Sequence, residues 1–342
     1  MNNSFENNGE IQKSDGRNFS NDVFDLKGEI IKETPYVNSV RKEILKKVIG
    51  QEDMITKMLI GIFTGNHILL EGLPGLAKSL TVNTIAKTLG LKFSRIQFTP
   101  DLLPSDIIGT EIYNEKNGEF YIKRGPIFAN IILADEINRA PAKVQSALLE
   151  AMQEKQITIA SETFPLDEPF IVLATQNPIE QDGTYPLPEA QQDRFLMKVK
   201  IEYPTKEEEK QILKLLTSKA EYENIEVMEI LNKEKIKRIK NLIRQIHIDD
   251  KLIEYIVDIV FRTREKNSYI LCGASPRASI AITMAAKGNA FIEGREFVLP
   301  KDIKMVIFDV LRHRIIPTYE AEADGKSIED IIVDILEKVK LP

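Results

Sequence analysis

The stretch that decides the fold is EGLPGLAKSL, residues 71–80. It approaches the phosphate-binding loop pattern of Gly, any four residues, Gly, Lys, and then Ser or Thr. Gly72, Lys78 and Ser79 fit this pattern, whereas Ala77 stands where the second glycine is expected. A short apolar strand pattern precedes the loop and a helical pattern follows it, which is the context that such a loop requires.

Backbone N–H groups in this loop, together with the positive end of the following helix, would surround phosphate oxygens. Lys78 would bridge the outer phosphates and Ser79 would place its hydroxyl on Mg²⁺; the alternative for Lys78 is a solvated lysine at a helix start. Only a positive φ penalises a β-carbon heavily, so we expect a negative φ at Ala77. The residues expected to bind the phosphates are Gly72, Leu73, Pro74, Gly75, Leu76, Ala77, Lys78, Ser79 and Leu80.

A second candidate element is ANIILADEINRAP, residues 129–141, an apolar strand that ends in two acids. Asp135 at the carboxyl end of a neighbouring strand would hold the water shell of Mg²⁺. Glu136 beside it would polarise an attacking water. The alternative is that this pair caps a helix or only adds solubility.

The third element is ATQNPIEQDGTYPLPEAQQDRF, residues 174–195. Asn177 follows an apolar strand, where its amide would orient water against a γ-phosphate; an Asx turn before Pro178 is the alternative. Arg194 precedes another strand and is either an arginine finger donated to a neighbour's nucleotide or a surface salt-bridge partner.

The fourth element is CGASPRASI, residues 272–280. Arg277 is predicted to lie in the first turn of a helix, where a cation opposes the helix dipole. This placement suggests that Arg277 meets an anion. The alternative is an ordinary capped helix start.

Short apolar strands alternate with helical patterns from residue 50 onward, which predicts a five-stranded parallel sheet covered by helices on both faces. Asn117-Gly118 between alternating runs predicts a β-hairpin insertion over 109–126. We expect a disordered tail at 1–20, an α/β core at 21–203 and a smaller helical domain at 204–342. The predicted strands cover residues 67–71, 92–99, 130–134, 170–175 and 195–201, and the helices include 53–64, 78–89, 141–154, 207–260, 275–293 and 327–340.

The bulk composition is that of a globular protein, with 43% hydrophobic and 29% charged residues. Its net charge of −6 argues mildly against a dedicated nucleic-acid binder. The single cysteine, Cys272, excludes a disulfide framework within the chain. Because the chain has a single cysteine, we expect a reducing, cytoplasmic setting. Neither a signal peptide nor a membrane span is visible in the sequence.

Other polar and aromatic features have structural explanations. The histidines, His67, His247 and His313, show no metal-ligand spacing. The basic run within EKIKRIKNLIRQIH, 234–247, is interpreted as a solvated helix face rather than a nucleic-acid contact. Tyr113 and Tyr121 flank the hairpin turn and are expected to pack across the strands.

The ordered set GLPGLAKS, LADEINRAP, ATQNP, EAQQDRF and GASPRAS resembles the MoxR family of AAA+ ATPases. RHRIIP, 312–317, is also similar to that family, and the resemblance runs from about residue 48 to 317. It implies an α/β nucleotide-binding core with a helical lid, and ATP with Mg²⁺ as cofactors. Alanine before the loop lysine is common in the family, and the 109–126 hairpin resembles an insertion that this clade carries.

The resemblance also assigns roles. Lys78 and Ser79 would bind phosphate and Mg²⁺, Asp135 would bind Mg²⁺, and Glu136 would activate water. Asn177 resembles sensor 1, Arg194 the arginine finger and Arg277 sensor 2, which acts either on its own nucleotide or on a neighbour's. Gly50 and Gln51 lie in a segment that resembles the one beside the adenine.

Proteins of this family usually form hexamers, so the resemblance implies a homo-oligomer, expected to be a hexamer. It further implies a chaperone-like remodelling activity on protein clients, with a separate partner that carries a von Willebrand factor A domain. Two rival functions stay open at this point: a DNA-dependent AAA+ motor, and a nucleotide-dependent scaffold that does not hydrolyse ATP.

Overall fold

The structure of the chain is a computed structural model that describes residues 19–178, 184–217 and 225–342. Residues 1–18 of the predicted tail lie outside this range. The long helix α1 (Phe19–Leu45) already begins at residue 19, so the last two residues of the predicted tail are helical instead.

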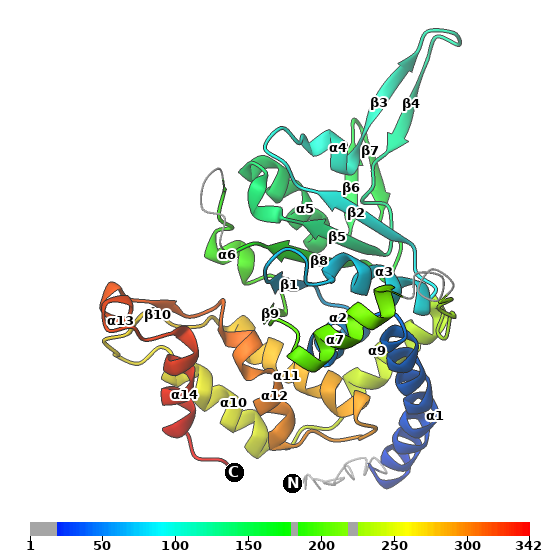
Figure 1. Cartoon of the computed structure of the whole chain (residues 1–342). Coiled ribbons are helices and arrows are strands. Elements are labelled where there is room, and N and C mark those ends of the chain that lie inside the picture. The colour runs from blue at the N-terminus through cyan, green and yellow to red at the C-terminus, as the bar shows by residue number, and fades with distance from the viewer. Residues whose placement is uncertain (1–18, 179–183, 218–224) are drawn as a thin grey trace, which may run out of the picture.

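A five-stranded parallel sheet forms the centre of the core (Figure 1), as the sequence predicts. The strands lie in the order β2-β5-β8-β1-β9, and every neighbouring pair is parallel. Each lies within two residues of its predicted bounds. The strands are β1 (Ile68–Glu71), β2 (Phe93–Gln97), β5 (Ile131–Asp135), β8 (Ile171–Gln176) and β9 (Met197–Lys200).

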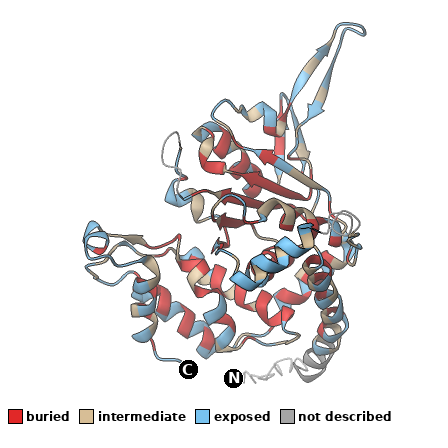
Figure 2. Cartoon of the chain, viewed as in Figure 1, coloured by how far each residue is buried: buried red, intermediate tan, exposed pale blue. Residues whose placement is uncertain are grey.

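Successive residues of the buried strands enter two separate cores, because side chains alternate across a sheet. In β5, Ile131 and Leu133 join the core shared with α2 (Glu52–Thr64) and α3 (Lys78–Thr88). Ile132 and Ala134 join the core beneath α5 (Ala142–Glu154). Figure 2 shows the resulting buried sheet with helices on both faces.

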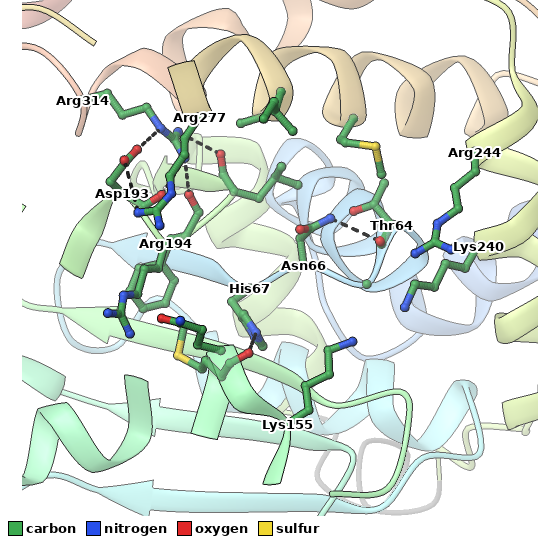
Figure 3. Close-up of a pocket in the computed structure, with 18 residues that line it drawn as sticks. Thr64, Asn66, His67, Lys155, Asp193, Arg194, Lys240, Arg244, Arg277 and Arg314 are labelled. Atoms are coloured by element: carbon green, nitrogen blue, oxygen red, sulfur yellow. Dashed lines mark hydrogen bonds and ion pairs between the residues drawn. The ribbon is translucent and has the colours of Figure 1, made fainter. Parts of the chain in front are cut away.

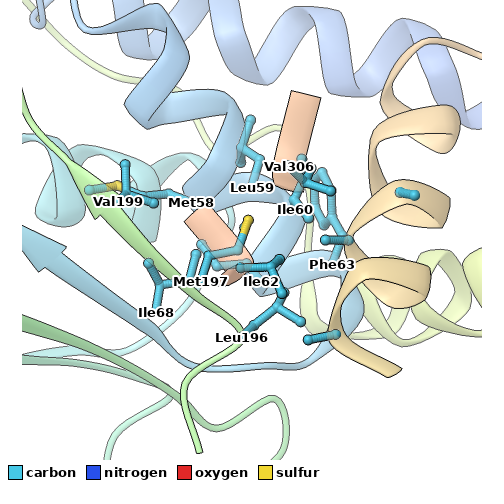
Figure 4. Packing of buried hydrophobic residues seen from close by; sticks show 14 of the residues in the cluster. Met58, Leu59, Ile60, Ile62, Phe63, Ile68, Leu196, Met197, Val199 and Val306 are labelled. Atoms are coloured by element: carbon cyan, nitrogen blue, oxygen red, sulfur yellow. The ribbon is translucent and has the colours of Figure 1, made fainter. Parts of the chain in front are cut away.

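Helix α2 is buried along its whole inner length, from Met54 to Thr64. Figure 4 shows its side chains packed between the sheet residues Ile68, Met197 and Val199 and the lid residue Val306. This stretch is apolar apart from two threonines and Lys57, which pairs with Asp309 of the lid, so the helix has no solvent-facing side and lies between two layers. Helix α2 therefore joins the core to the lid.

Two β-hairpins extend from the core. The predicted insertion forms β3 (Gly109–Asn114) and β4 (Glu119–Arg124), which project away from the molecule (Figure 1). Four residues, 115–118, join them, and Tyr113 pairs with Phe120, with ring centroids 5.0 Å apart. Tyr113 therefore packs across the strands, as expected, and Tyr121, on the opposite face of the hairpin, lies opposite Ile112 in the register. The second hairpin, β6 (Gln156–Ile159) and β7 (Glu162–Pro165), was not predicted.

The lid is mainly helical, as expected, and contacts α2 and β9. A small antiparallel pair, β10 (Ile270–Cys272) with β11 (Ile316–Pro317), was not predicted, nor was helix α12. The lid helices are α7 (Lys206–Thr217), α9 (Lys233–Gln245), α10 (Asp250–Arg262), α11 (Pro276–Ile292), α12 (Pro300–Leu311), α13 (Tyr319–Ala323) and α14 (Ile328–Glu337). Three short elements of the core complete the described structure: α4 (Pro104–Ile108), the 3₁₀-helix η1 (Ile137–Arg139) and α6 (Glu189–Gln192). The domain boundary at 203/204 stays a prediction. Within the described residues, no helix has both the length and the apolarity needed to cross a membrane.

Three consecutive side chains of the RHRIIP segment fasten the lid to the core. Arg312 donates to the carbonyl of Lys198 at 2.5 Å, and His313 Nε2 lies 3.2 Å from the carbonyl oxygen of Phe195. The guanidinium of Arg314 donates to the carbonyls of Phe195 and Leu196 and pairs with Asp193 at 2.8 Å. Arg314 is only 2% exposed, so its charge depends on these partners.

We expect Arg314→Ala to lower the free energy of unfolding by about 3–5 kcal/mol, because it breaks a buried ion pair and leaves several carbonyls without donors. Denaturant unfolding measures this change. The matched control is Arg277→Ala, which removes an exposed arginine facing the same aspartate and should cost about 0.5 kcal/mol or less. Equal costs for the two variants would contradict the proposed fastening.

Candidate functional site

The loop at 72–80 joins β1 to α3 at the carboxyl end of the sheet. Gly72 packs so closely on Ile201 that an added β-carbon would lie 2.9 Å from the Ile201 β-carbon. Gly75 has a φ of 88° and open space around it, so a ligand can approach its backbone closely. Ala77 has a φ of 55°. The expected negative φ at Ala77 is therefore wrong.

The left-handed conformation at Ala77 has a physical explanation in the turn of the loop. Ala77 immediately precedes the first residue of α3, and positive φ values at Gly75 and Ala77 curl the backbone as it approaches the helix. Such conformations orient successive N–H groups into an anion-binding concavity. An alanine in this region costs about 1–2 kcal/mol, so the loop holds Ala77 at a local energetic cost.

Lys78 and Ser79 form the first turn of α3 and are both half-buried. The ammonium of Lys78 donates to the carbonyl oxygen of Gly72 across the loop at 2.7 Å. Burial lowers the pKa of Lys78, while the charges of Asp135 and Glu136 oppose that shift. A lysine that is both desolvated and held inside a loop is placed to receive a negative ligand.

Asp135 ends β5 and Glu136 follows it with a φ of 57°. The hydroxyl of Thr175 donates to Asp135 Oδ1 at 2.7 Å and accepts the N–H of Glu136 at 2.8 Å. Thr175 therefore fixes both acids at once. Thr175 is not among the residues predicted from the sequence, although a threonine near the end of an apolar strand was a visible signal.

Two further residues of β2 that the sequence analysis missed contact the same acids. Arg95 donates to Asp135 Oδ2 through Nε at 3.0 Å and Nη2 at 2.6 Å. Gln97 donates to Glu136 Oε2 at 2.7 Å and accepts from Arg95 Nη2 at 2.9 Å. Arg95 and Gln97 are two residues apart on one strand, so their side chains lie on the same face.

Asn177 is buried just beyond β8, which lies between β1 and β5 in the sheet. Asp135 therefore ends the strand two places from the loop, and Asn177 follows the strand in between. These residues share one cavity of about 340 Å³ with the loop. The cavity is lined by Pro74, Gly75, Leu76, Ala77, Lys78, Ser79, Leu80, Arg95, Asp135, Glu136 and Asn177.

Gly50 and Gln51 precede α2 and both have positive φ values, 70° and 60°. The side-chain amide of Gln51 donates to the carbonyl of Glu202 at 2.9 Å, one residue beyond the Ile201 that packs on Gly72. These residues therefore border the loop through a shared segment, but Gln51 lines a separate cavity.

Arg194 and Arg277 lie in another cavity, of about 420 Å³ (Figure 3), which has no lining residue in common with the loop cavity. Arg194 is exposed and donates to the carbonyl of Leu149 at 3.1 Å. Arg277 Nη1 lies 3.6 Å from Asp193 Oδ2, so the anion that it meets within this chain is Asp193. Among the described lining residues, one acid, Asp193, faces the cations Lys155, Arg194, Lys240, Arg244, Arg277 and Arg314.

The two cavities lie at opposite ends of the parallel strands. Arg194 precedes β9, and Leu196 donates to the carbonyl of His67, which precedes β1. The loop, Glu136 and Asn177 instead follow their strands, and Asp135 is the last residue of β5. Strands of four to six residues rise about 3.3 Å per residue, so the two ends lie roughly 13–20 Å apart. This is farther than an arginine side chain extends.

We expect Ala77→Gly to raise the free energy of unfolding by about 0.5–1 kcal/mol, because glycine removes the left-handed strain but loses more entropy on folding. Urea denaturation followed by circular dichroism measures this change. Ala147→Gly in the middle of α5 is the control and should lower stability by about 1 kcal/mol. A destabilised Ala77→Gly variant would show that the alanine is not strained.

Comparison with known proteins follows the same division into core and lid. Residues 67–197 match the family "ATPase family associated with various cellular activities (AAA)", and residues 262–335 match the family "AAA lid domain". The chain is 47% identical to Chaperone MoxR1 of Mycobacterium tuberculosis over 88% of this chain and 81% of that protein. It is 43% identical to the uncharacterized protein YeaC of Bacillus subtilis, over 90% of this chain and 95% of YeaC.

A crystal structure of a supposed ATPase from Cytophaga hutchinsonii superposes with a TM-score of 0.87 at 52% identity. It covers 94% of this chain and 99% of that protein. Two relatives above 40% identity, a shared fold and the two matched domains agree on one assignment. The chain belongs to the MoxR family of AAA+ ATPases.

Proposed function

We propose that this ATPase binds and hydrolyses ATP with Mg²⁺ between adjoining copies of the chain. One observation carries this proposal. The phosphate loop and the acids lie at the carboxyl ends of the strands, whereas Arg194 and Arg277 line a cavity at the amino ends. One copy offers a cradle and acids, and the next offers guanidinium groups. Neither end of the strands holds all the groups that phosphoryl transfer uses.

The loop cavity fits a magnesium–triphosphate. Open space at Gly75 admits phosphate oxygens to the backbone, and the Lys78 ammonium would neutralise them. Magnesium takes few protein ligands and keeps several waters, so the Ser79 hydroxyl and Asp135 suffice to hold it. Bound Mg²⁺ would supply charge neutralisation on the phosphates.

The remaining residues have distinct roles in this proposal. Glu136 would take the proton of an attacking water, and the Asn177 amide would orient that water. Arg194 would stabilise charge on a neighbour's γ-phosphate, and Arg277, which lines the same cavity, would act on that neighbour's nucleotide as well. Gly50 and Gln51 would lie beside the adenine.

The same geometry supports a ring assembly, because each Arg194 would need a neighbour's phosphates. We propose a homo-oligomer, with a hexamer as the expected size, that works in the cytoplasm. Its ATP cycle would remodel or activate a protein client, together with a separate partner carrying a von Willebrand factor A domain. Similarity to a protein named as a chaperone supports this role over a DNA motor.

Lys78→Ala should weaken ATP binding by at least about tenfold, because the phosphates lose a charged donor.

Glu136→Gln should retain ATP and the oligomer but slow hydrolysis by about 100-fold or more. Fluorescent-nucleotide binding, light scattering and phosphate release measure these effects. Unchanged ATP affinity in the first variant, or full turnover in the second, would discard the corresponding role.

Arg194→Ala should leave ATP binding intact and slow hydrolysis by about a thousandfold, as for other arginine fingers. Mixing this variant with Lys78→Ala should restore part of the activity, because the intact loop of one meets the intact arginine of the other. Failure of rescue at every mixing ratio would place Arg194 outside its neighbour's site. DNA-stimulated hydrolysis that falls with salt would instead favour the motor function.

A further inference from the structure

Asp135 is the acid expected to hold the water shell of Mg²⁺, and both of its carboxylate oxygens already accept hydrogen bonds. Oδ1 accepts from the Thr175 hydroxyl, and Oδ2 accepts twice from the Arg95 guanidinium. Metal-bound water at this carboxylate needs an oxygen that can accept from it. Arg95 fills both acceptor sites of Oδ2, whereas Oδ1 keeps one, so moving the Arg95 guanidinium aside would open Oδ2 as well to a metal-bound water.

The two partners of Asp135 differ in how easily they can leave. Thr175 is fully buried within β8, and its hydroxyl also accepts the N–H of Glu136, so turning it away from Asp135 would break a second hydrogen bond. The Arg95 side chain is 51% exposed, and β2 is the edge strand of the sheet. A long, half-exposed side chain at an edge can turn into solvent, where its charge is well hydrated. Arg95 is therefore the displaceable partner.

Displacing Arg95 also changes the surroundings of Glu136. Arg95 Nη2 donates to Gln97 Oε1, and Gln97 Nε2 donates to Glu136 Oε2. A second cation, Arg139, lies 3.2 Å from the same Glu136 oxygen. Loss of the Arg95 contact would free the Gln97 amide to reorient. Displacement of Arg95 from Asp135 would therefore also change the hydrogen bond from Gln97 to Glu136, the acid proposed to activate water.

We propose that Arg95 is a built-in counter-cation of Asp135 that competes with Mg²⁺ and thereby sets the metal concentration at which the site assembles. Arg95 is a positioning residue that acts through Asp135 and, through Gln97, on Glu136. This proposal rests on the proposed function, because it assumes that Asp135 faces the magnesium of a bound nucleotide.

The expected effect is modest because the pair is half-exposed. Exposed ion pairs are weak, so removing the competitor should lower the half-saturating metal concentration by about threefold, which corresponds to about 0.7 kcal/mol. A residue that merely supports the fold would change stability without shifting metal affinity in this direction. A residue that binds the metal–nucleotide directly would shift the metal affinity in the opposite direction.

The experiment titrates Mn²⁺ into the full chain with a non-hydrolysable ATP analogue and follows free Mn²⁺ by electron paramagnetic resonance. Arg95→Gln removes the charge and keeps a long polar side chain, and Arg95→Ala removes both; each should bind Mn²⁺ about threefold more tightly than the wild type. Arg95→Lys keeps the charge and should lie between. Lys92→Ala is the matched control. It removes an exposed cation just before β2, at the end of the strand away from Asp135, and should leave the titration unchanged.

Unchanged or weaker Mn²⁺ binding in both uncharged variants, with the wild type binding normally, would overturn this proposal alone. A wild type that fails to bind the metal–nucleotide would overturn the proposed function and this inference together. Thermal unfolding without nucleotide accompanies each titration. A variant that is unfolded at the working temperature is replaced by Arg95→Lys, which must then show at least some tightening for the proposal to stand.

Discussion

The parallel pairing of β1 with both β8 and β9 is the constraint on which the rest of the molecule depends. Parallel strands run in one direction, so every segment that follows a strand lies at the same end of the sheet. Every segment that precedes a strand lies at the other end. The phosphate loop and Asn177 follow their strands and Asp135 ends β5, whereas Arg194 precedes β9. The division of the candidate site residues between the two ends of the strands is thus a result of strand direction, and no loop has to be long or unusual to produce it.

Much of this arrangement could be predicted from the sequence, because its signals are local. Buried parallel strands appear as short apolar runs, and the functional residues stand directly beside them. The first hairpin was visible through Asn117-Gly118. The second hairpin was not, because its turn places a positive φ at Ala160, where no glycine or asparagine marks it.

The features that escaped prediction depend on tertiary structure. The φ of Ala77 is set by the curl of the whole loop rather than by the preference of alanine. The partner of Tyr113 depends on hairpin register, which a four-residue turn fixes and a sequence pattern does not. Arg95 and Gln97 were placed on a strand, but only the strand order shows that β2 lies beside β5 and brings them to the two acids. The roles of the individual site residues stay predictions.

The buried guanidinium of Arg314 has a mechanical consequence. It grips the backbone at Phe195 and Leu196 and the carboxylate of Asp193, the residue directly before Arg194. Ser275 at the start of α11 holds the same carboxylate. The lid and the segment that carries Arg194 are therefore held together through Asp193 and its neighbours, so a movement of the lid relative to the core would either break these contacts or shift the backbone beside Arg194 with it.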